Sequence, residues 1–375
     1  MPTMIKNELR IELLTPAFLG DAEQKGVWRT PPLKALLREW WRIVAAPEAG
    51  YRHQALREQE GVLFGNAWLD SGATQSKLRL ALAHWHEGKS GWEGRDPSLT
   101  HPEVKNRNTG QAQPVGSQLY LGYGPLVYER GAGTALKNNA ALQAGDSNVL
   151  KLAWSEQETA IPHVLQLIHW FGTIGGRSRN GWGSLEFVGQ KTLVKNDEAL
   201  HTVLRPLADC LQRDWPHAIG QDKQGALIWE SKKTFNTWQE AMRFLAQTKI
   251  GFRTQENIRF KKGVPHPNER KRNQDWQLHH QPEERHLLAY PVTHHEVQKQ
   301  RARGDEQTDW GDGRLANQLR FKLFRDSQQQ LRARIYHTPH ACPLPGVTLD
   351  QQAVWQKIHA WLDHNTELQR LGGAQ

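Results

Sequence analysis

Cysteine is almost absent from this chain: its 375 residues include only Cys210 and Cys342, far apart in the sequence. Neither belongs to a closely spaced pair, so the sequence excludes a disulfide framework and a cysteine-based zinc site. Apolar runs of membrane-spanning length are also missing, and the first residues carry no apolar segment of the kind found in secretion signals. We therefore expect a protein of the reducing cytoplasm that has no membrane partner.

Hydrophobic residues are few, at 38% of the sequence, whereas tryptophan is abundant, with 16 copies. Large aromatic side chains can fill a core that has few aliphatic residues, so the composition predicts folded domains rather than disorder. The formal net charge is +9. This excess of lysine and arginine favours an acidic polymer as partner, although a solvated surface would give the same count.

Glycine is concentrated in residues 172–184, GTIGGRSRNGWGS, which hold five glycines in thirteen residues. Residues 161–171 before this stretch have helical spacing, and residues 184–188 after it alternate like a strand. The stretch is therefore a helix–strand connection, and we name it the Gly-rich loop. We expect Gly172 to end the helix at a positive φ.

The Gly-rich loop is suited to binding phosphates, because glycines let the backbone approach a ligand closely and arginines pair with phosphate oxygens. The order helix–loop–strand excludes both a Walker loop and a dinucleotide-binding fingerprint. A plain connection with solvated arginines is the alternative. The candidate phosphate-binding residues of the loop are Gly175, Gly176, Arg177, Ser178, Arg179 and Asn180.

The N-terminal region predicts a strand over residues 8–14, then a loop, then a helix that Pro31 and Pro32 open. One stripe of this helix is apolar. A second stripe, at steps of four, carries Lys34, Arg38 and Arg42 and is a candidate RNA-binding surface, with a solvated helix back as the alternative.

These motifs resemble a known family. The Gly-rich loop has the pattern G-x-x-G-G-R-S-R-x-G-x-G-S of the RAMP superfamily, the RNA-binding subunits of CRISPR effector complexes. The segments TPAFLG (15–20), WRTPPLKALLREWWR (28–42) and EGVLFG (60–65) are similar to the opening of the first, two-domain RAMP subunit family of type III-B (Cmr) complexes. Asp21 stands where that family often has a second glycine.

The element order of residues 1–190 agrees with this resemblance. Strands are predicted at 8–14, 77–83, 118–128 and 184–190, with helices after the first and third. Tyr120 and Tyr123 in the third strand either stack on bases or pack in the core. The polar residues 86–116 form a long loop, which is either disordered or, by resemblance, a thumb with Trp92 near its tip. We therefore predict an α+β fold with two ferredoxin-like (RRM-like) domains in tandem, 1–190 and 191–375.

The second predicted domain has helices at 200–211, 238–245 and 349–362 and strands at 226–229, 314–324 and 331–337. Residues 249–272 form a basic loop that is either an RNA contact or solvated. Its candidate RNA-binding residues are Arg259, Lys261, Lys262, Arg270, Lys271 and Arg272.

The resemblance implies a non-catalytic subunit that caps the 3′ end of the guide RNA (crRNA) in antiviral defence. It would contact target RNA and neighbouring RAMP subunits, with no cofactor. Two other classes stay open: a stand-alone endoribonuclease that processes guide RNA, and a structural adaptor that binds only proteins. Catalysis would need a base beside the RNA, and Asp21 lies in an early loop where cleaving RAMP subunits carry an aspartate. We expect no catalytic residue and no metal, because the histidines lack metal-site spacing.

Overall fold

The computed structural model describes residues 3–67, 72–88, 92, 96–106, 109–138, 141–261, 263–272, 274–298, 300, 301, 307, 308, 310 and 313–372. The chain divides into two compact units that interleave along the sequence. Unit 1 holds Met1–Leu204, Glu230–Gln247 and Phe321–Ile335, and unit 2 holds Arg205–Trp229, Thr248–Arg320 and Tyr336–Gln375. The predicted domain boundary after residue 190 stays a prediction.

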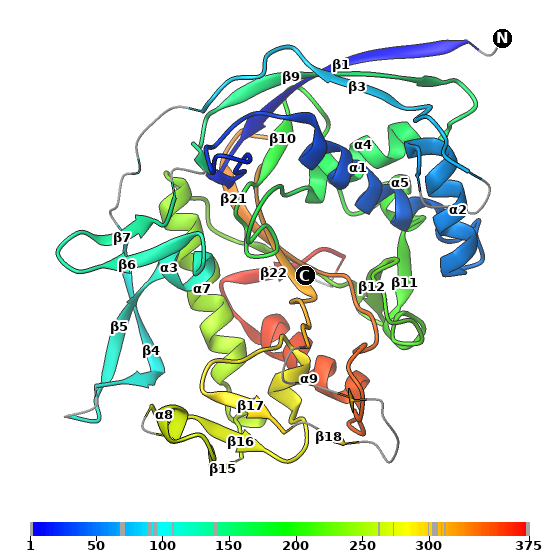
Figure 1. Cartoon of the computed structure of the whole chain (residues 1–375). Helices are drawn as coiled ribbons and strands as arrows, with labels where there is room; N and C mark the ends of the chain where they lie inside the picture. Colours follow the sequence, from blue (N-terminus) through cyan, green and yellow to red (C-terminus); the bar gives the residue numbers. More distant parts are fainter. Residues whose placement is uncertain are drawn as a thin grey trace. The chain divides into compact units, whose positions relative to one another are not determined.

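The main sheet of unit 1 has four antiparallel strands in the order β10-β1-β9-β3 (Figure 1). They are β1 (Met4–Leu13), β3 (Arg79–Leu82), β9 (Ser147–Ser155) and β10 (Leu185–Phe187). Ile11 of β1 lies opposite Phe187 of β10, and both side chains are buried, because alternate residues of a strand point to the same face. The alternation predicted for residues 8–14 is confirmed.

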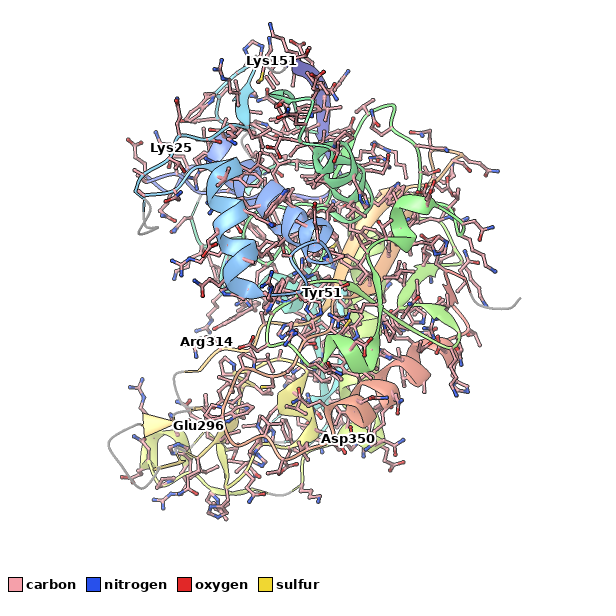
Figure 2. All side chains as sticks on the ribbon, turned by 90° about the vertical axis from the view of Figure 1, so that its right-hand side faces the viewer. Lys25, Tyr51, Lys151, Glu296, Arg314 and Asp350 are labelled. Atoms are coloured by element: carbon pink, nitrogen blue, oxygen red, sulfur yellow. The ribbon has the colours of Figure 1, made fainter. Side chains whose placement is uncertain are left out.

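Helices α1 (Thr30–Ala45) and α4 (Ala160–Phe171) pack together under this sheet, where the Trp40 and Phe171 rings stack with centroids 5.5 Å apart. Both helices agree with the sequence prediction, including prolines in the first turn of α1. In the view of Figure 2, exposed Lys151 of β9 lies at the top, with α1 below the strands. The sheet thus buries one face against the helices, whereas Glu8, Arg10 and Lys151 on its other face are exposed.

The third strand of this sheet is β9, which we did not predict, although Leu150, Leu152 and Trp154 alternate and are buried. The prediction of a strand over 118–128 is wrong at its start: these residues form α3 (Ser117–Gly122) and then β6 (Leu126–Glu129). A tertiary contact explains the helix. The Asp96 carboxylate accepts hydrogen bonds from the backbone N–H groups of Gln118 (2.7 Å) and Leu119 (3.0 Å), which caps the helix start.

Smaller strand pairs complete unit 1: β2 (Ala17–Phe18) with β8 (Ala141–Leu142), β4 (Ser98–Lys105) with β5 (Ala112–Gly116), and β6 with β7 (Gly133–Leu136). The described part of the predicted 86–116 loop therefore contains a hairpin. A helix, α2 (His53–Phe64), follows α1, and α5 (Glu198–His201) follows β10.

Strands β20 (Leu319–Arg325), β21 (Leu331–His337) and β14 (Ile228–Ser231) pair in that order. Most of β20 and the adjoining parts of β21 and β14 belong to unit 1, as does the first part of α7 (Trp238–Thr254).

Unit 2 contains short sheets and the helix α9 (Gln351–His364). Its sheets are β11-β12-β13 and β15-β16-β17, and β18 pairs with β19. Their bounds are Leu204–Pro206, Ile219–Asp222, Gly225–Ala226, Val264–Pro265, Gln277–His279, His295–Val297, Gln300–Arg301 and Gln307–Thr308. The remaining elements are α6 (Leu207–Cys210), η1 (Glu256–Ile258), α8 (Glu269–Arg272), η2 (Glu284–Leu287) and β22 (Leu368–Arg370).

Two predictions for this part of the chain are wrong. The helix expected over 200–211 is divided into α5, β11 and α6, because Pro206 has no backbone N–H to donate. The basic segment 249–272 is not a continuous loop: α7 continues through Thr254, with Ile250 and Phe252 buried, and α8 lies at the other end.

The mixed α and β content of the prediction is confirmed, whereas the tandem ferredoxin-like arrangement stays a prediction. Within the described residues, no helix is both long enough and apolar enough to cross a membrane.

Candidate nucleic-acid interface

The early loop, which begins at the segment TPAFLG (15–20), and the Gly-rich loop form one hydrogen-bonded structure in unit 1. The Gly176 N–H donates to the carbonyl oxygen of Phe18 (2.9 Å), and the Gly183 N–H donates to that of Pro16 (2.8 Å). The Thr15 hydroxyl donates to the Gly181 carbonyl (2.8 Å) and accepts from the Ser184 N–H (2.9 Å). Residues that lie as many as 169 positions apart in the sequence therefore form a single site.

Gly172 does not have the positive φ that we expected at the helix end: its φ is −67° and its backbone is extended. Its N–H still donates to the Ile168 carbonyl (2.7 Å). A Cβ at this position would lie 2.5 Å from the same carbonyl oxygen. Glycine is required here because of a close backbone approach, and not because of a left-handed conformation.

Arg177 is the most exposed cation of the loop, and its backbone has φ of 56°, in the left-handed region. Its guanidinium makes no hydrogen bond or ion pair with the residues that the structure describes. Arg179 is half-buried, and its carbonyl accepts from the Phe321 N–H (3.1 Å). Asn180 is buried and donates from Nδ2 to the Leu121 carbonyl (2.8 Å). The loop thus presents Arg177, whereas Asn180 fixes its backbone.

A pocket of about 410 Å³ lies between the loop and the start of α1. The loop contributes Thr173, Ile174, Gly175, Gly176 and Ser178 to its wall. The remaining wall consists of Phe18, Leu19, Gly20, Arg29, Pro32, Ala35, Leu36 and Glu39. Three of the predicted site residues, Gly175, Gly176 and Ser178, therefore line one concave surface.

Arg29 in this pocket was missed by the sequence analysis. Its Nη2 donates to the Gly20 carbonyl (2.6 Å), which connects α1 to the early loop. Its Nε is buried and has no hydrogen-bond partner among the described residues. The available indication was an arginine two residues before the first helix-opening proline, because its position at the helix start is set by the same motif.

The basic stripe of α1 does not line the pocket. The residues of α1 that line the pocket are Pro32, Ala35, Leu36 and Glu39, and the wall does not include Lys34, Arg38 or Arg42. Arg38 Nε donates to the buried Glu60 carboxylate (2.6 Å), and Arg42 donates to it through Nε and Nη2. Burial and the neighbouring charge of Arg38 lower the pKa of Lys34. The stripe is therefore partly committed to holding α1 against α2.

The basic segment belongs to unit 2. Arg259, Lys261, Arg270 and Arg272 are exposed, whereas Lys271 pairs with Glu296 and lies over the Trp276 ring, 5.1 Å from its centroid. Lys262 lies outside the described residues.

The Asp21 carboxylate organises its own turn, because Oδ1 accepts from the backbone N–H groups of Glu23 (2.9 Å) and Lys25 (2.8 Å). It is not part of the pocket wall. In the described part of the chain, no three histidine, cysteine or acidic side chains come together in a way that could hold a metal ion.

Comparison with known proteins finds a family profile that matches the region containing this site. The RAMP superfamily profile matches residues 10–186, and no curated protein matches the chain. Among solved structures, apo Cmr1 from Pyrococcus furiosus is 16% identical, with 98% of this chain and 99% of that chain covered and a TM-score of 0.44. A chain of the type III-B Cmr-beta complex bound to cognate target RNA is 10% identical, with 96% and 99% covered and a TM-score of 0.44. The region that matches the RAMP superfamily profile, residues 10–186, includes both the early loop and the Gly-rich loop.

Proposed function

We propose that this chain is a non-catalytic RNA-binding subunit of a type III-B CRISPR effector complex in antiviral defence. It caps the 3′ end of the guide RNA and contacts target RNA and neighbouring RAMP subunits. One observation carries the RNA-binding part: Arg177 extends, exposed and without an ion-pair partner among the described residues, from a loop that is held rigidly beside a pocket. The strand order β10-β1-β9-β3 also supports the first of the two proposed ferredoxin-like domains.

The loop geometry suits phosphate binding, because its backbone is fixed before a ligand arrives. The bonds from Thr15, Phe18 and Asn180 hold the loop in place, so little conformational entropy is lost on binding. A guanidinium pairs with two phosphate oxygens at once. In this proposal Arg177 binds a guide phosphate, and Arg29 provides a second donor inside the pocket.

The basic segment of unit 2 provides further phosphate contacts in this proposal. Its exposed cations contact RNA phosphates and do not distinguish one base from another. They are Arg259, Lys261, Arg270 and Arg272. The α1 stripe contributes less, because Glu60 neutralises part of its charge.

Binding of fluorescently labelled single-stranded RNA by the full chain tests the proposal. The logarithm of affinity should fall linearly with the logarithm of salt concentration, with a slope of about 0.7 per phosphate contact. Arg177→Ala should weaken binding about threefold to tenfold. It should also reduce the magnitude of the slope by about 0.7, the contribution of one phosphate contact. The matched control is Arg10→Ala, which removes an exposed arginine of β1 and should change neither quantity. Salt-independent binding, or equal effects of the two variants, would contradict the proposal.

The position in the complex needs a separate test. A photoreactive 4-thiouridine is placed at the 3′ end or at the 5′ end of the guide in a reconstituted effector complex. We expect crosslinks from the 3′ end to this chain. Crosslinks from the 5′ end alone would overturn the capping assignment while leaving RNA binding itself intact.

A further inference from the structure

The tip of the Gly-rich loop lies against the turn that follows α3, and the two segments form one surface in unit 1. A Cβ added to Gly176 would lie 3.5 Å from Pro125 Cγ. A Cβ added to Gly124, whose φ is 114°, would lie 3.2 Å from Arg177 Nη2. The Arg177 guanidinium therefore rests over Gly124, where any larger residue would displace it.

Hydrogen bonds to neighbouring segments hold the loop and the turn in this arrangement. The Asn180 side chain connects the loop to the Leu121 carbonyl at the end of α3 (2.8 Å). On the other side of the turn, the Lys137 N–H donates to the Pro125 carbonyl (2.9 Å), and the Gly124 N–H donates to the Leu126 carbonyl (3.1 Å). Both the loop and the turn are consequently fixed before a ligand binds.

Tyr123, the residue before Gly124, is 68% exposed. The sequence left open whether Tyr120 or Tyr123 packs in the core, and the structure separates them. Tyr120 is half-buried and contacts the His101 ring edge-on, with centroids 5.5 Å apart. Tyr123 presents an exposed aromatic ring one residue before Gly124, the residue over which the Arg177 guanidinium lies.

We propose that Tyr123 and Arg177 form a platform for one nucleotide of single-stranded RNA. Tyr123 stacks on the base, and Arg177 pairs with an adjacent phosphate. An exposed ring beside a cation is the combination with which proteins bind single strands without sequence preference, because every base has a π-face and every nucleotide has a phosphate. The inference rests on the proposed function, and it specifies single-stranded nucleotides as the ligand of this surface.

RNA fits this surface better than a protein partner does. The pair combines a ring and a cation, the chain has a net charge of +9, and the guanidinium has no carboxylate partner among the described residues. A nucleotide supplies both the flat ring and the negative charge that these two side chains complement.

The test compares the full chain with Tyr123→Leu, Tyr123→Phe, Arg177→Ala and the control Trp85→Leu. Trp85 is 63% exposed and follows β3, which lies at the opposite sheet edge from β10. Affinity is measured by fluorescence anisotropy for a labelled RNA oligonucleotide and for an oligonucleotide of equal length built from abasic ribose phosphates. Melting curves verify that each variant is folded.

We expect Tyr123→Leu to weaken binding of normal RNA at least about fivefold, whereas Tyr123→Phe keeps wild-type affinity, since a phenyl ring also stacks. On the abasic strand Tyr123→Leu should have no effect, whereas Arg177→Ala should weaken binding of both strands. Trp85→Leu should change neither.

The platform is overturned if Tyr123→Leu binds normal RNA as the wild type does, or if it weakens both strands equally. Unchanged RNA affinity together with lost co-purification of a RAMP neighbour would also overturn it and assign the surface to protein. A wild-type chain that binds neither strand would refute the proposed RNA-binding function together with the platform, so the two failures are distinguishable.

Discussion

The side-chain nitrogen of Lys322, on strand β20, donates a hydrogen bond to the main-chain carbonyl of His169 in the last turn of helix α4. It also donates to the Ile168 carbonyl (3.2 Å), and Arg334 Nη1 donates to the Trp170 carbonyl (2.6 Å). The last carbonyls of a helix lack partners within the helix, so these two side chains complete its C-terminus. Gly172 follows directly, and the start of the Gly-rich loop is therefore fixed by residues from the C-terminal half of the sequence.

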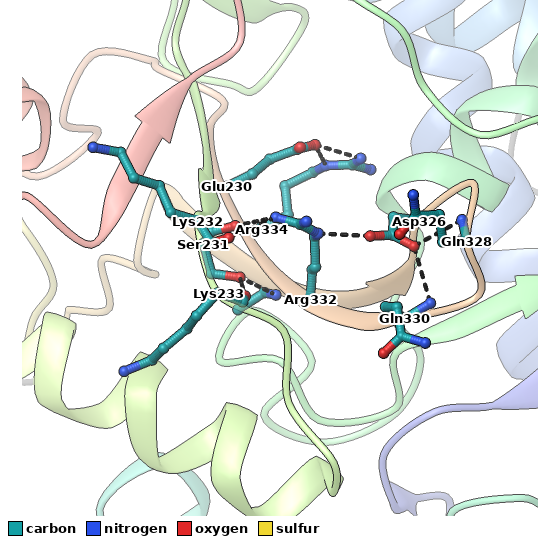
Figure 3. Close-up of polar contacts among 10 residues, drawn as sticks. Glu230, Ser231, Lys232, Lys233, Asp326, Gln328, Gln330, Arg332 and Arg334 are labelled. Carbon is teal, nitrogen blue, oxygen red and sulfur yellow. Dashed lines mark hydrogen bonds and ion pairs between the residues drawn. The ribbon is translucent and has the colours of Figure 1, made fainter.

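The partners of Arg334 hold it in this position. Its Nε (2.9 Å) and Nη2 (2.6 Å) donate to the Glu230 carboxylate, and neighbouring Arg332 is held by Asp326 (2.7 Å), as Figure 3 shows. Arg334 also lies over the Phe324 ring, 3.9 Å from its centroid. Contacts from strands β14 and β20 thus orient the Arg334 guanidinium of β21 toward the C-terminal end of α4.

Lys322→Met should alter the pH dependence of stability. Burial and the Arg334 charge lower the pKa of Lys322 well below its usual 10.5. The unfolded chain therefore binds a proton that the folded chain releases, so this residue makes stability rise as pH increases toward 10.5. As pH rises from 7 to 9, the wild type should gain unfolding free energy relative to the variant, measured by urea unfolding. The control is Lys151→Met on the exposed sheet face, which should leave the pH dependence of the unfolding free energy as in the wild type. The expectation is refuted if the unfolding free energies of the wild type and Lys322→Met change equally with pH.

Gly183→Ala and Gly176→Ala should differ strongly in stability. Gly183 has φ of 64°, and its added Cβ would lie 1.9 Å from the Ile174 carbonyl oxygen. Gly176 does not have a positive φ, and its added Cβ would meet Phe18 Cβ at 3.4 Å. We expect Gly183→Ala to lose at least about 2 kcal/mol of unfolding free energy and Gly176→Ala to change it by less than about 1 kcal/mol. Equal stabilities in chemical denaturation would contradict this backbone geometry.

Glu60→Gln should loosen α1 from α2. Burial raises the pKa of the Glu60 carboxyl, but hydrogen bonds and charges from Arg42 and Arg38 outweigh this effect and lower it below 4.5. The contribution of Glu60 is then present above about pH 4.5 and is lost as pH falls further. Because the arginines are partly exposed, we expect a loss of about 1–2 kcal/mol at pH 7. The difference from wild type should shrink near pH 3, and a constant difference would show that the carboxylate charge is unimportant.

Residues 1–190 alone should not form a stable native domain. The Leu323 N–H donates to Ser184 Oγ (2.9 Å), and the Phe321 N–H donates to the Arg179 carbonyl, so deletion of β20 removes partners of the Gly-rich loop. We expect this fragment to bind the dye ANS and to lack a cooperative thermal transition, in contrast to the full chain. A cooperative transition in the fragment would refute the structural dependence on β20.

The sequence by itself determined the elements whose pattern is local. Helical spacing and the paired prolines gave α1, spacing gave α4 and α9, and alternation gave β1 and β21. The glycine and arginine pattern located the loop and its superfamily. These results follow from short-range periodicity, because each residue's environment there depends on neighbours a few positions away.

The tertiary structure decided what depends on contacts between distant residues. Asp96 caps α3 where we predicted a strand. Glu60 pairs with Arg38 and Arg42, two arginines that we predicted to bind RNA. The Asn180 side chain hydrogen-bonds to the Leu121 carbonyl and supports the Gly-rich loop. Arg29 enters the pocket, and Tyr123 remains exposed where Tyr120 is covered. Periodicity carries no information on which charged group meets which partner 18 or more residues away, so the same arginine pattern is compatible with a free phosphate ligand and with a buried carboxylate until the chain is folded.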